Sequence, residues 1–137
     1  MFPTKRPRRL RVNHKTRRLV RQIVVKPQNL VYPIFVAENI EEPKEIAAMP
    51  NQMHWPIEMA YVPVQKAINN NVYSFLVFGV PNHKDESGTE AYNENNVVCR
   101  AIKNIKKHCP EAYIITDVCL CAYTSHGHCG LITESGH

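Results

Sequence analysis

The order of apolar and polar positions predicts three buried strands along this chain. Three runs are apolar almost throughout and rich in β-branched or aromatic residues, which is typical of strands covered on both faces. They occupy residues 29–36, 73–80 and 113–120. Pro33, inside the first run, argues against a fully regular central strand there, because proline donates no backbone hydrogen bond.

Helical spacing of apolar residues predicts the elements around these strands. The predicted helices cover residues 16–25, 64–70 and 93–107, with a shorter helix around residues 44–48. Asparagines at 69–71 follow the second of these helices, and asparagine tolerates the left-handed backbone of a helix C-terminal cap. Residues 53–63 contain two prolines and fit neither period.

Strand, helix, strand, helix, strand is the pattern of βαβ units, so we expect an α/β fold with a parallel sheet. Doubly wound sheets and (β/α)8 barrels share this pattern. No glycine-rich dinucleotide or phosphate-binding motif follows the first strand, which argues against a nucleotide-binding fold.

Charge divides the chain into a basic N-terminal arm and helix, residues 1–26, and a remainder, residues 27–137. The arm contains ten lysines or arginines and no acidic residue, whereas the remainder carries a net charge of −5. Such a block can lie in solvent, bind nucleic acid or dock on a neighbouring subunit. No aromatic residue lies between its basic residues for base stacking, so we expect no nucleic acid partner.

Cysteine and hydropathy patterns indicate a reducing compartment. No run of 18 apolar residues is present, so no membrane span is expected, and the N-terminus lacks the apolar stretch of a secretory signal. Five cysteines, three of them close together, do not form a disulfide framework. We therefore expect a cytoplasmic protein.

Three cysteines follow the last predicted strand. Cys119 and Cys121 would point the same way from an extended strand end, because the side-chain period of a strand is two. Residues 122–128 can loop back and bring Cys129 to the same point. The pattern indicates either a zinc site or an ordinary thiol-rich loop. Cys99 and Cys109 lie on or beside a helical pattern and are expected to be buried or uninvolved thiols.

The number of ligands decides what kind of zinc site this would be. Three protein ligands leave a position open, as in catalytic zinc, whereas four close a structural site. His126 and His128 are rival ligands, and either could close the sphere. Both alternatives stay open at this level.

The segment at residues 117–130, DVCLCAYTSHGHCG, resembles the zinc signature of the porphobilinogen synthases, also called 5-aminolevulinate dehydratases. Further landmarks of bacterial members follow the same order, at residues 6–11, 29–36, 49–50 and 84–92. The resemblance covers essentially the whole chain. It implies the first three strands and intervening helices of a (β/α)8 TIM barrel, preceded by an extended basic arm. Since a whole barrel needs about 250 residues, it implies the N-terminal part of a longer enzyme.

The resemblance also implies an activity. These enzymes are hydro-lyases that condense two 5-aminolevulinate molecules to porphobilinogen in tetrapyrrole and heme biosynthesis, and they hold substrate as Schiff bases on lysines well downstream. No lysine here matches those positions. The chain would carry the zinc half of the site, with Zn2+ on Cys119, Cys121 and Cys129 and one position open for substrate. The alternative is an inactive truncated zinc-binding fragment.

Asp117 is the catalytic candidate. It lies two residues before Cys119 and would point into the site, where a carboxylate can accept the substrate amine or shuttle protons. Capping of the loop is the alternative role. The acidic residues of the loop at 85–90 receive no catalytic role. The resemblance further implies a homo-oligomer, an octamer in the family, assembled through the N-terminal arm.

Overall fold

A five-stranded sheet forms the body of the protein in the computed structural model, which describes residues 8–133. The strands are β1 (Val31–Ala37), β2 (Lys44–Glu45), β3 (Met53–Pro56), β4 (Ser74–Val80) and β5 (Tyr113–Thr116). Their order across the sheet is β2-β3-β1-β4-β5. All neighbouring pairs are parallel except β2 and β3, which are antiparallel. The predicted α/β fold with a parallel sheet is therefore confirmed.

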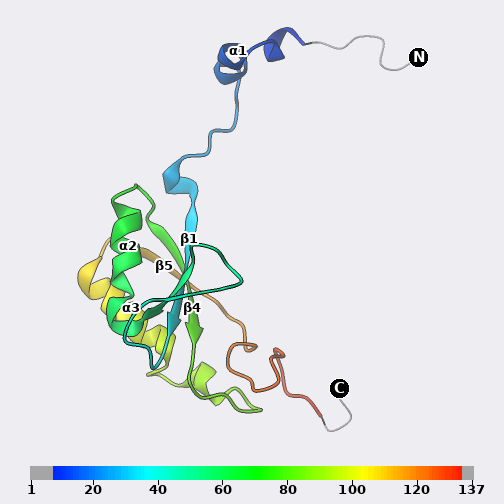
Figure 1. Cartoon of the computed structure of the whole chain (residues 1–137). Helices are drawn as coiled ribbons and strands as arrows, with labels where there is room; N and C mark the ends of the chain where they lie inside the picture. The colour runs from blue at the N-terminus through cyan, green and yellow to red at the C-terminus, as the bar shows by residue number, and fades with distance from the viewer. Residues whose placement is uncertain (1–7, 134–137) are drawn as a thin grey trace.

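Helices cover one face of this sheet. The α-helices are α1 (His14–Leu19), α2 (Tyr61–Ile68) and α3 (Val97–His108). Short 3-10 helices are η1 (Arg9–Arg11), η2 (Pro27–Asn29), η3 (Ile57–Met59) and η4 (Thr89–Tyr92). In Figure 1, α2 and α3 lie on the same side of the sheet, and α3 contacts both β1 and β4.

The core lies between the sheet and these two helices. Its largest fully buried apolar residues are Ile34, Val36, Phe75 and Val77 from the sheet, and Val64, Val97 and Ile105 from the helices. In α3 the buried residues recur every four positions, so a single apolar stripe faces the sheet. On the opposite face of the sheet Phe35 and Phe78 stack, with ring centroids 5.2 Å apart.

The ends of the predicted helices differ from the structure. The side chain of Asn96 accepts a hydrogen bond from the backbone of Cys99 at 2.9 Å, and this cap starts α3 four residues after the predicted position. The helix predicted at 64–70 begins earlier, at Tyr61, and tolerates Pro63 because its first turn needs no intrahelical N–H donor. Asn71 has φ of 63°, which confirms the left-handed asparagine.

Residues 44–59 contain the main corrections. The predicted helix at 44–48 is wrong, because Lys44–Glu45 form strand β2 and the backbone then turns. The backbone N–H of Ile46 donates to the carbonyl of Gln52 at 3.0 Å, which closes that turn. The region that fitted neither period contains strand β3 and helix η3.

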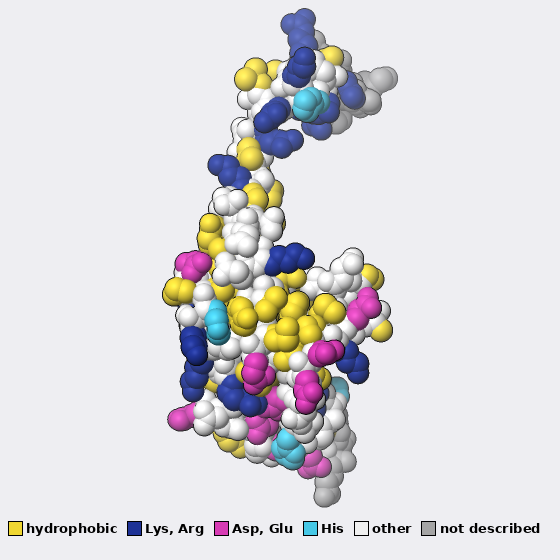
Figure 2. Space-filling view, turned by 60° about the vertical axis from the view of Figure 1, so that its left-hand side comes forward, with side chains coloured by type: hydrophobic (Ala, Val, Ile, Leu, Met, Phe, Trp, Pro, Cys, Tyr) yellow, Lys and Arg dark blue, Asp and Glu magenta, His cyan; other side chains and the backbone are white. Residues whose placement is uncertain are grey.

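The N-terminal arm extends away from the body. Helix α1 ends at Leu19, so the helix predicted over 16–25 is too long. Leu19 and Ile23 are 86% and 79% exposed, and without a packed apolar face so short a helix gains little stability. Figure 2 shows lysine and arginine side chains gathered on the arm, whereas the acidic side chains lie on the body. The first seven residues of the predicted arm fall outside the described residues.

Candidate metal centre

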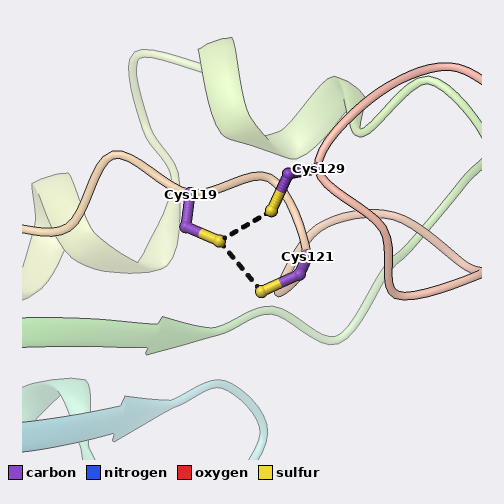
Figure 3. Close-up of side chains that lie close together, drawn as sticks. All are labelled: Cys119, Cys121 and Cys129. Carbon is purple, nitrogen blue, oxygen red and sulfur yellow. Dashed lines mark hydrogen bonds between the residues drawn. The ribbon is translucent and has the colours of Figure 1, made fainter.

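Three cysteine sulfurs meet just beyond the C-terminal end of β5. The Sγ atom of Cys119 lies 2.9 Å from that of Cys121 and 3.1 Å from that of Cys129 (Figure 3). All three sulfurs lie within 4.8 Å of one another. Tetrahedral Zn–S bonds of about 2.3 Å would set sulfurs roughly 3.8 Å apart, so a zinc ion would need only a small outward shift of these thiols. Thiolates are preferred zinc ligands, and the donor set fits that metal.

Cys119 and Cys121 lie where the chain leaves β5 and enters a turn. Strand β5 ends at Thr116, four residues before the end of the predicted strand, because the chain leaves the sheet there. The carbonyl of Leu120 accepts hydrogen bonds from the backbone N–H groups of Tyr123 and Thr124, at 2.8 and 3.0 Å. The strand expected to reach these cysteines therefore ends before them, but their side chains point the same way as predicted, with the two sulfurs 2.9 Å apart.

The rest of the loop folds back as predicted. The hydroxyl of Thr124 donates to the carbonyl of His128 at 2.8 Å, and the backbone of Gly127 donates to Thr124 at 3.3 Å. Gly127 has φ of +74°, a conformation that glycine adopts without steric cost. Cys129, the next residue after His128, is thereby returned to the other two cysteines.

The two histidines of this loop lie outside the sulfur group. The Nε2 atom of His126 is 3.3 Å from the carbonyl of Glu86, and its Nδ1 atom accepts a hydrogen bond from the backbone of His128 at 3.2 Å. Both ring nitrogens of His126 thus have backbone partners. Within residues 8–133, the group of side chains placed to hold a metal consists of the three cysteines alone. The geometry favours the open, three-thiolate alternative.

The thiols influence one another's protonation. Hydrogen bonds to Cys121 and Cys129 hold the proton on Cys119 and raise its pKa from 9.0 to about 11. The hydrogen bond from Cys119 lowers the pKa of Cys129. Cys129 is therefore the thiol that ionises more readily of this pair. A metal ion that binds here has to displace the remaining protons.

A cavity of about 310 Å³ adjoins Cys119. It lies between the N-terminal half of α3 and the segment after β5, and its lining includes Val98, Cys99, Ile102, Asp117, Cys119, Leu120 and Tyr123. Asp117 lines this cavity but does not belong to the three-sulfur group. The pKa of Tyr123 is raised, mainly by burial and further by the charges of Cys99 and Asp117.

A second loop, which the sequence pattern did not predict, supports the cysteine loop. Asp85 and Thr124 form a parallel β-bridge, and the backbone of Ser125 donates to the carbonyl of Asp85 at 2.9 Å. The Asp85 carboxylate accepts hydrogen bonds from the backbones of Ser87 and Thr89 and from the Thr89 hydroxyl, and these bonds lower its pKa. The local signal was an aspartate two residues before a serine, which is typical of an Asx turn.

The other cysteines lie outside the centre, as expected. Cys109 is fully buried in the core, and Cys99 lies half-buried on α3. Two further histidines contact aromatic rings: His108 stacks on Tyr61 with ring centroids 4.1 Å apart, and His54 lies edge-on to Phe35. These rings stabilise the fold and take no part in the centre.

The fold and the centre together define a class: an α/β protein with a mostly parallel sheet and a cysteine cluster beyond the C-terminal end of β5. The family model described as delta-aminolevulinic acid dehydratase matches residues 4–136. The chain belongs to the delta-aminolevulinic acid dehydratase family.

Individual relatives agree with this assignment. Delta-aminolevulinic acid dehydratase of Ruminiclostridium josui is 45% identical over 128 residues, covering 93% of this chain and 62% of the relative. The enzyme of Archaeoglobus fulgidus is 45% identical over 133 residues, covering 97% of this chain and 41% of the relative. This chain therefore spans 62% of the length of the first of these proteins and 41% of the second.

A solved structure carries the same fold. The crystal structure of delta-aminolevulinic acid dehydratase (porphobilinogen synthase) from Toxoplasma gondii, in complex with the reaction product porphobilinogen, superposes with a TM-score of 0.89 at 34% identity. The match covers all of this chain and 40% of that one. The sheet and helices described above therefore correspond to part of the barrel of this enzyme family.

Proposed function

We propose that this chain carries the zinc-binding part of a porphobilinogen synthase, which condenses two molecules of 5-aminolevulinate to porphobilinogen. The observation that carries the proposal is the convergence of Cys119, Cys121 and Cys129 at the end of β5. Their position beyond the C-terminal ends of parallel strands agrees with barrel chemistry.

The three thiolates would hold Zn2+ and leave a fourth position for substrate. When bound, zinc supplies a Lewis acid that polarises a carbonyl oxygen. Three thiolates give the occupied site a formal charge of −1, which softens that acidity. Orientation of the substrate by the cysteine loop and the adjoining cavity is then as important as its activation.

Asp117 is proposed to bind the substrate amine or to transfer protons during the reaction. It is exposed and lines the cavity beside Cys119, so a substrate amine held there would meet its carboxylate. A positioned carboxylate can accept an amine hydrogen bond or move a proton during the reaction. Capping of the loop remains the alternative role for this residue.

The covalent half of the chemistry would need residues beyond this chain. Every lysine within residues 8–133 is exposed, and a Schiff-base lysine is activated by desolvation or by neighbouring cations. We therefore propose that the chain alone is inactive and that activity depends on lysines from the rest of a family member. The second candidate function is a zinc-binding fragment without catalysis, which the same cysteine geometry would also serve.

Assembly through the N-terminal arm is the proposed oligomeric contact. The arm exposes seven large apolar residues: Leu10, Val12, Leu19, Val20, Ile23, Val24 and Val25. It is also strongly basic, whereas the body is acidic, so an arm and the body of a second copy have complementary charges. A homo-oligomer, with the family's octamer as the expected form, would bury both features. No nucleic acid partner is proposed.

A cytoplasmic location is proposed from the chemistry of the thiols. Free cysteines placed 2.9 to 3.1 Å apart persist as metal ligands in a reducing compartment. Among the described residues there is no helix of the length and apolar character that a membrane crossing requires.

A chimera tests the proposed function. Residues 1–137 are fused to the C-terminal remainder of the Archaeoglobus fulgidus relative, which is 45% identical over the shared part. The zinc-loaded chimera is expected to form porphobilinogen from 5-aminolevulinate, detected with Ehrlich's reagent, and the unfused chain is expected to form none. A folded, zinc-loaded chimera without product would support the fragment without catalysis.

A further inference from the structure

Thr124 connects both sides of the cysteine loop. Its backbone N–H donates to the carbonyl of Leu120, the residue between Cys119 and Cys121, at 3.0 Å. Its hydroxyl donates to the carbonyl of His128, the residue before Cys129, at 2.8 Å. We propose that Thr124 is the positioning residue of the three-cysteine centre, a role that rests on the proposed metal site.

Burial makes these two hydrogen bonds effective. Thr124 is only 2% exposed, so water has little access to the hydroxyl that donates to His128. His128 itself is an exposed residue, so its carbonyl would bind water once the Thr124 donor is lost. Loss of the hydroxyl would therefore release Cys129 from the other two sulfurs, while the turn that holds Cys119 and Cys121 would remain.

A second loop holds Thr124 from the other side. The backbone bridge between Asp85 and Thr124 joins the loop after β4 to the loop after β5. Gly88 is buried against Thr124: a Cβ atom added to Gly88 would lie 3.3 Å from the Thr124 methyl group. Gly88 also has φ of +63°, so this position requires a residue that lacks a Cβ atom and adopts the left-handed backbone without steric cost. The turn from Asp85 to Thr89 thus packs against Thr124 and restricts its position.

The hydroxyl and the methyl group of Thr124 have separate contacts, so substitutions can separate their effects. Thr124→Val keeps the β-branched shape against Gly88 but removes the donor to His128. Thr124→Ser keeps the donor and removes the methyl group. If the residue positions the centre through its hydroxyl, serine rescues metal binding and valine does not.

The test is a cobalt titration of the reduced full chain, followed through the thiolate-to-cobalt charge-transfer band. Partners that orient metal ligands typically change affinity roughly 10- to 100-fold, and Thr124→Val is expected to weaken cobalt binding by that factor. Its band is expected to lose intensity as one thiolate leaves the ion. Thr124→Ser should stay near the parent affinity. Ser125→Ala is the matched control. It removes a hydroxyl of the same loop, and within residues 8–133 that hydroxyl makes no hydrogen bond.

Each result decides between the two claims. A folded Thr124→Val chain with the parent's cobalt affinity and spectrum would overturn the positioning role. If circular dichroism shows that this variant does not fold, Asp85→Ala is tested in its place. This substitution removes the carboxylate that holds the turn from Asp85 to Thr89 against Thr124. Unchanged cobalt affinity in Asp85→Ala would also overturn the positioning role. If the parent chain binds no cobalt, the metal proposal fails. Capture of arsenite, which binds three thiols, then tests positioning by itself, and equal capture rates in parent and Thr124→Val would refute it.

Discussion

The Sγ atom of Cys119 lies 3.1 Å from the Sγ atom of Cys129, ten residues further along the chain. Two thiols of a flexible loop would not stay so close without a folded backbone around them. The hydrogen bonds of the loop therefore bring together the three donors that the proposed metal site requires.

Removal of any one cysteine of the group is expected to remove stoichiometric zinc. Cys119→Ala, Cys121→Ala or Cys129→Ala leaves two thiolates, which is too few to hold zinc without a further protein ligand. Zinc per chain is measured by atomic absorption after dialysis. Cys99→Ala is the control, because this thiol lies outside the group and should leave zinc content unchanged. Equal loss in the control would mean that the ligand set is wrong.

Asp117→Asn is expected to lower the turnover of the chimera while zinc content stays the same. Positioned acid–base groups contribute roughly 100-fold or more to rate, and the amide cannot exchange a proton in that role. Steady-state kinetics with 5-aminolevulinate measure kcat and KM separately. An unchanged kcat would instead assign Asp117 to capping the loop, where asparagine substitutes well.

Gly79→Ala is expected to destabilise the fold by about 1–3 kcal/mol, the usual cost of overpacking a core. A Cβ atom at this position of β4 would lie 2.6 Å from side-chain carbons of both Val97 and Val98, so α3 would have to move off the sheet. Urea unfolding of the metal-free chain measures the effect. Gly130→Ala serves as the control, because nothing lies within 4 Å of its added carbon. Similar losses in both variants would contradict the close packing of α3 on β4.

Thr89→Val is expected to raise the pKa of Asp85 toward its ordinary value of 3.8. The Thr89 hydroxyl is the main cause of the lowered pKa, because it donates to the charged carboxylate. A carboxylate with a lowered pKa contributes stability that is complete above 3.8 and is lost as the pH falls through the lowered value. An NMR titration of the Asp85 carboxyl carbon measures this shift, with Thr116→Val as a control on an exposed threonine. Identical Asp85 pKa values in Thr89→Val and the parent would refute the contact.

Polar substitutions on the arm are expected to disrupt assembly of the chimera. Leu19 and Ile23 are largely exposed here, and burial of each in an interface would contribute about 1.5–3 kcal/mol. The double variant Leu19→Ser, Ile23→Ser should therefore sediment as a smaller species than the parent chimera at equal concentration. Lys66→Ser, an exposed change on α2, should leave the sedimentation unchanged. A full-sized assembly in the double variant would exclude the apolar arm as the contact.

Local patterns were sufficient for much of the fold. The apolar runs located β1 and β4 within two residues of their ends, and the four-residue stripe located α3. The third run located the start of β5 but not its end. Periodicity succeeds here because each of these elements is long enough to bury a face of its own. The prediction of a helix at 44–48 was wrong because β2 is only two residues long and forms only by pairing with β3.

The sequence by itself determined the order of β1, α2, β4, α3 and β5, the family, and the presence of three cysteines within eleven residues, since all of these are properties of neighbouring residues. Tertiary structure alone decided where β5 ends, how the sulfurs converge and that the histidines lie outside the sulfur group. His126 is bound to Glu86, forty residues earlier, and Thr124 is bridged to Asp85. Such contacts depend on two parallel strands ending at the same edge of the sheet, which no local period encodes.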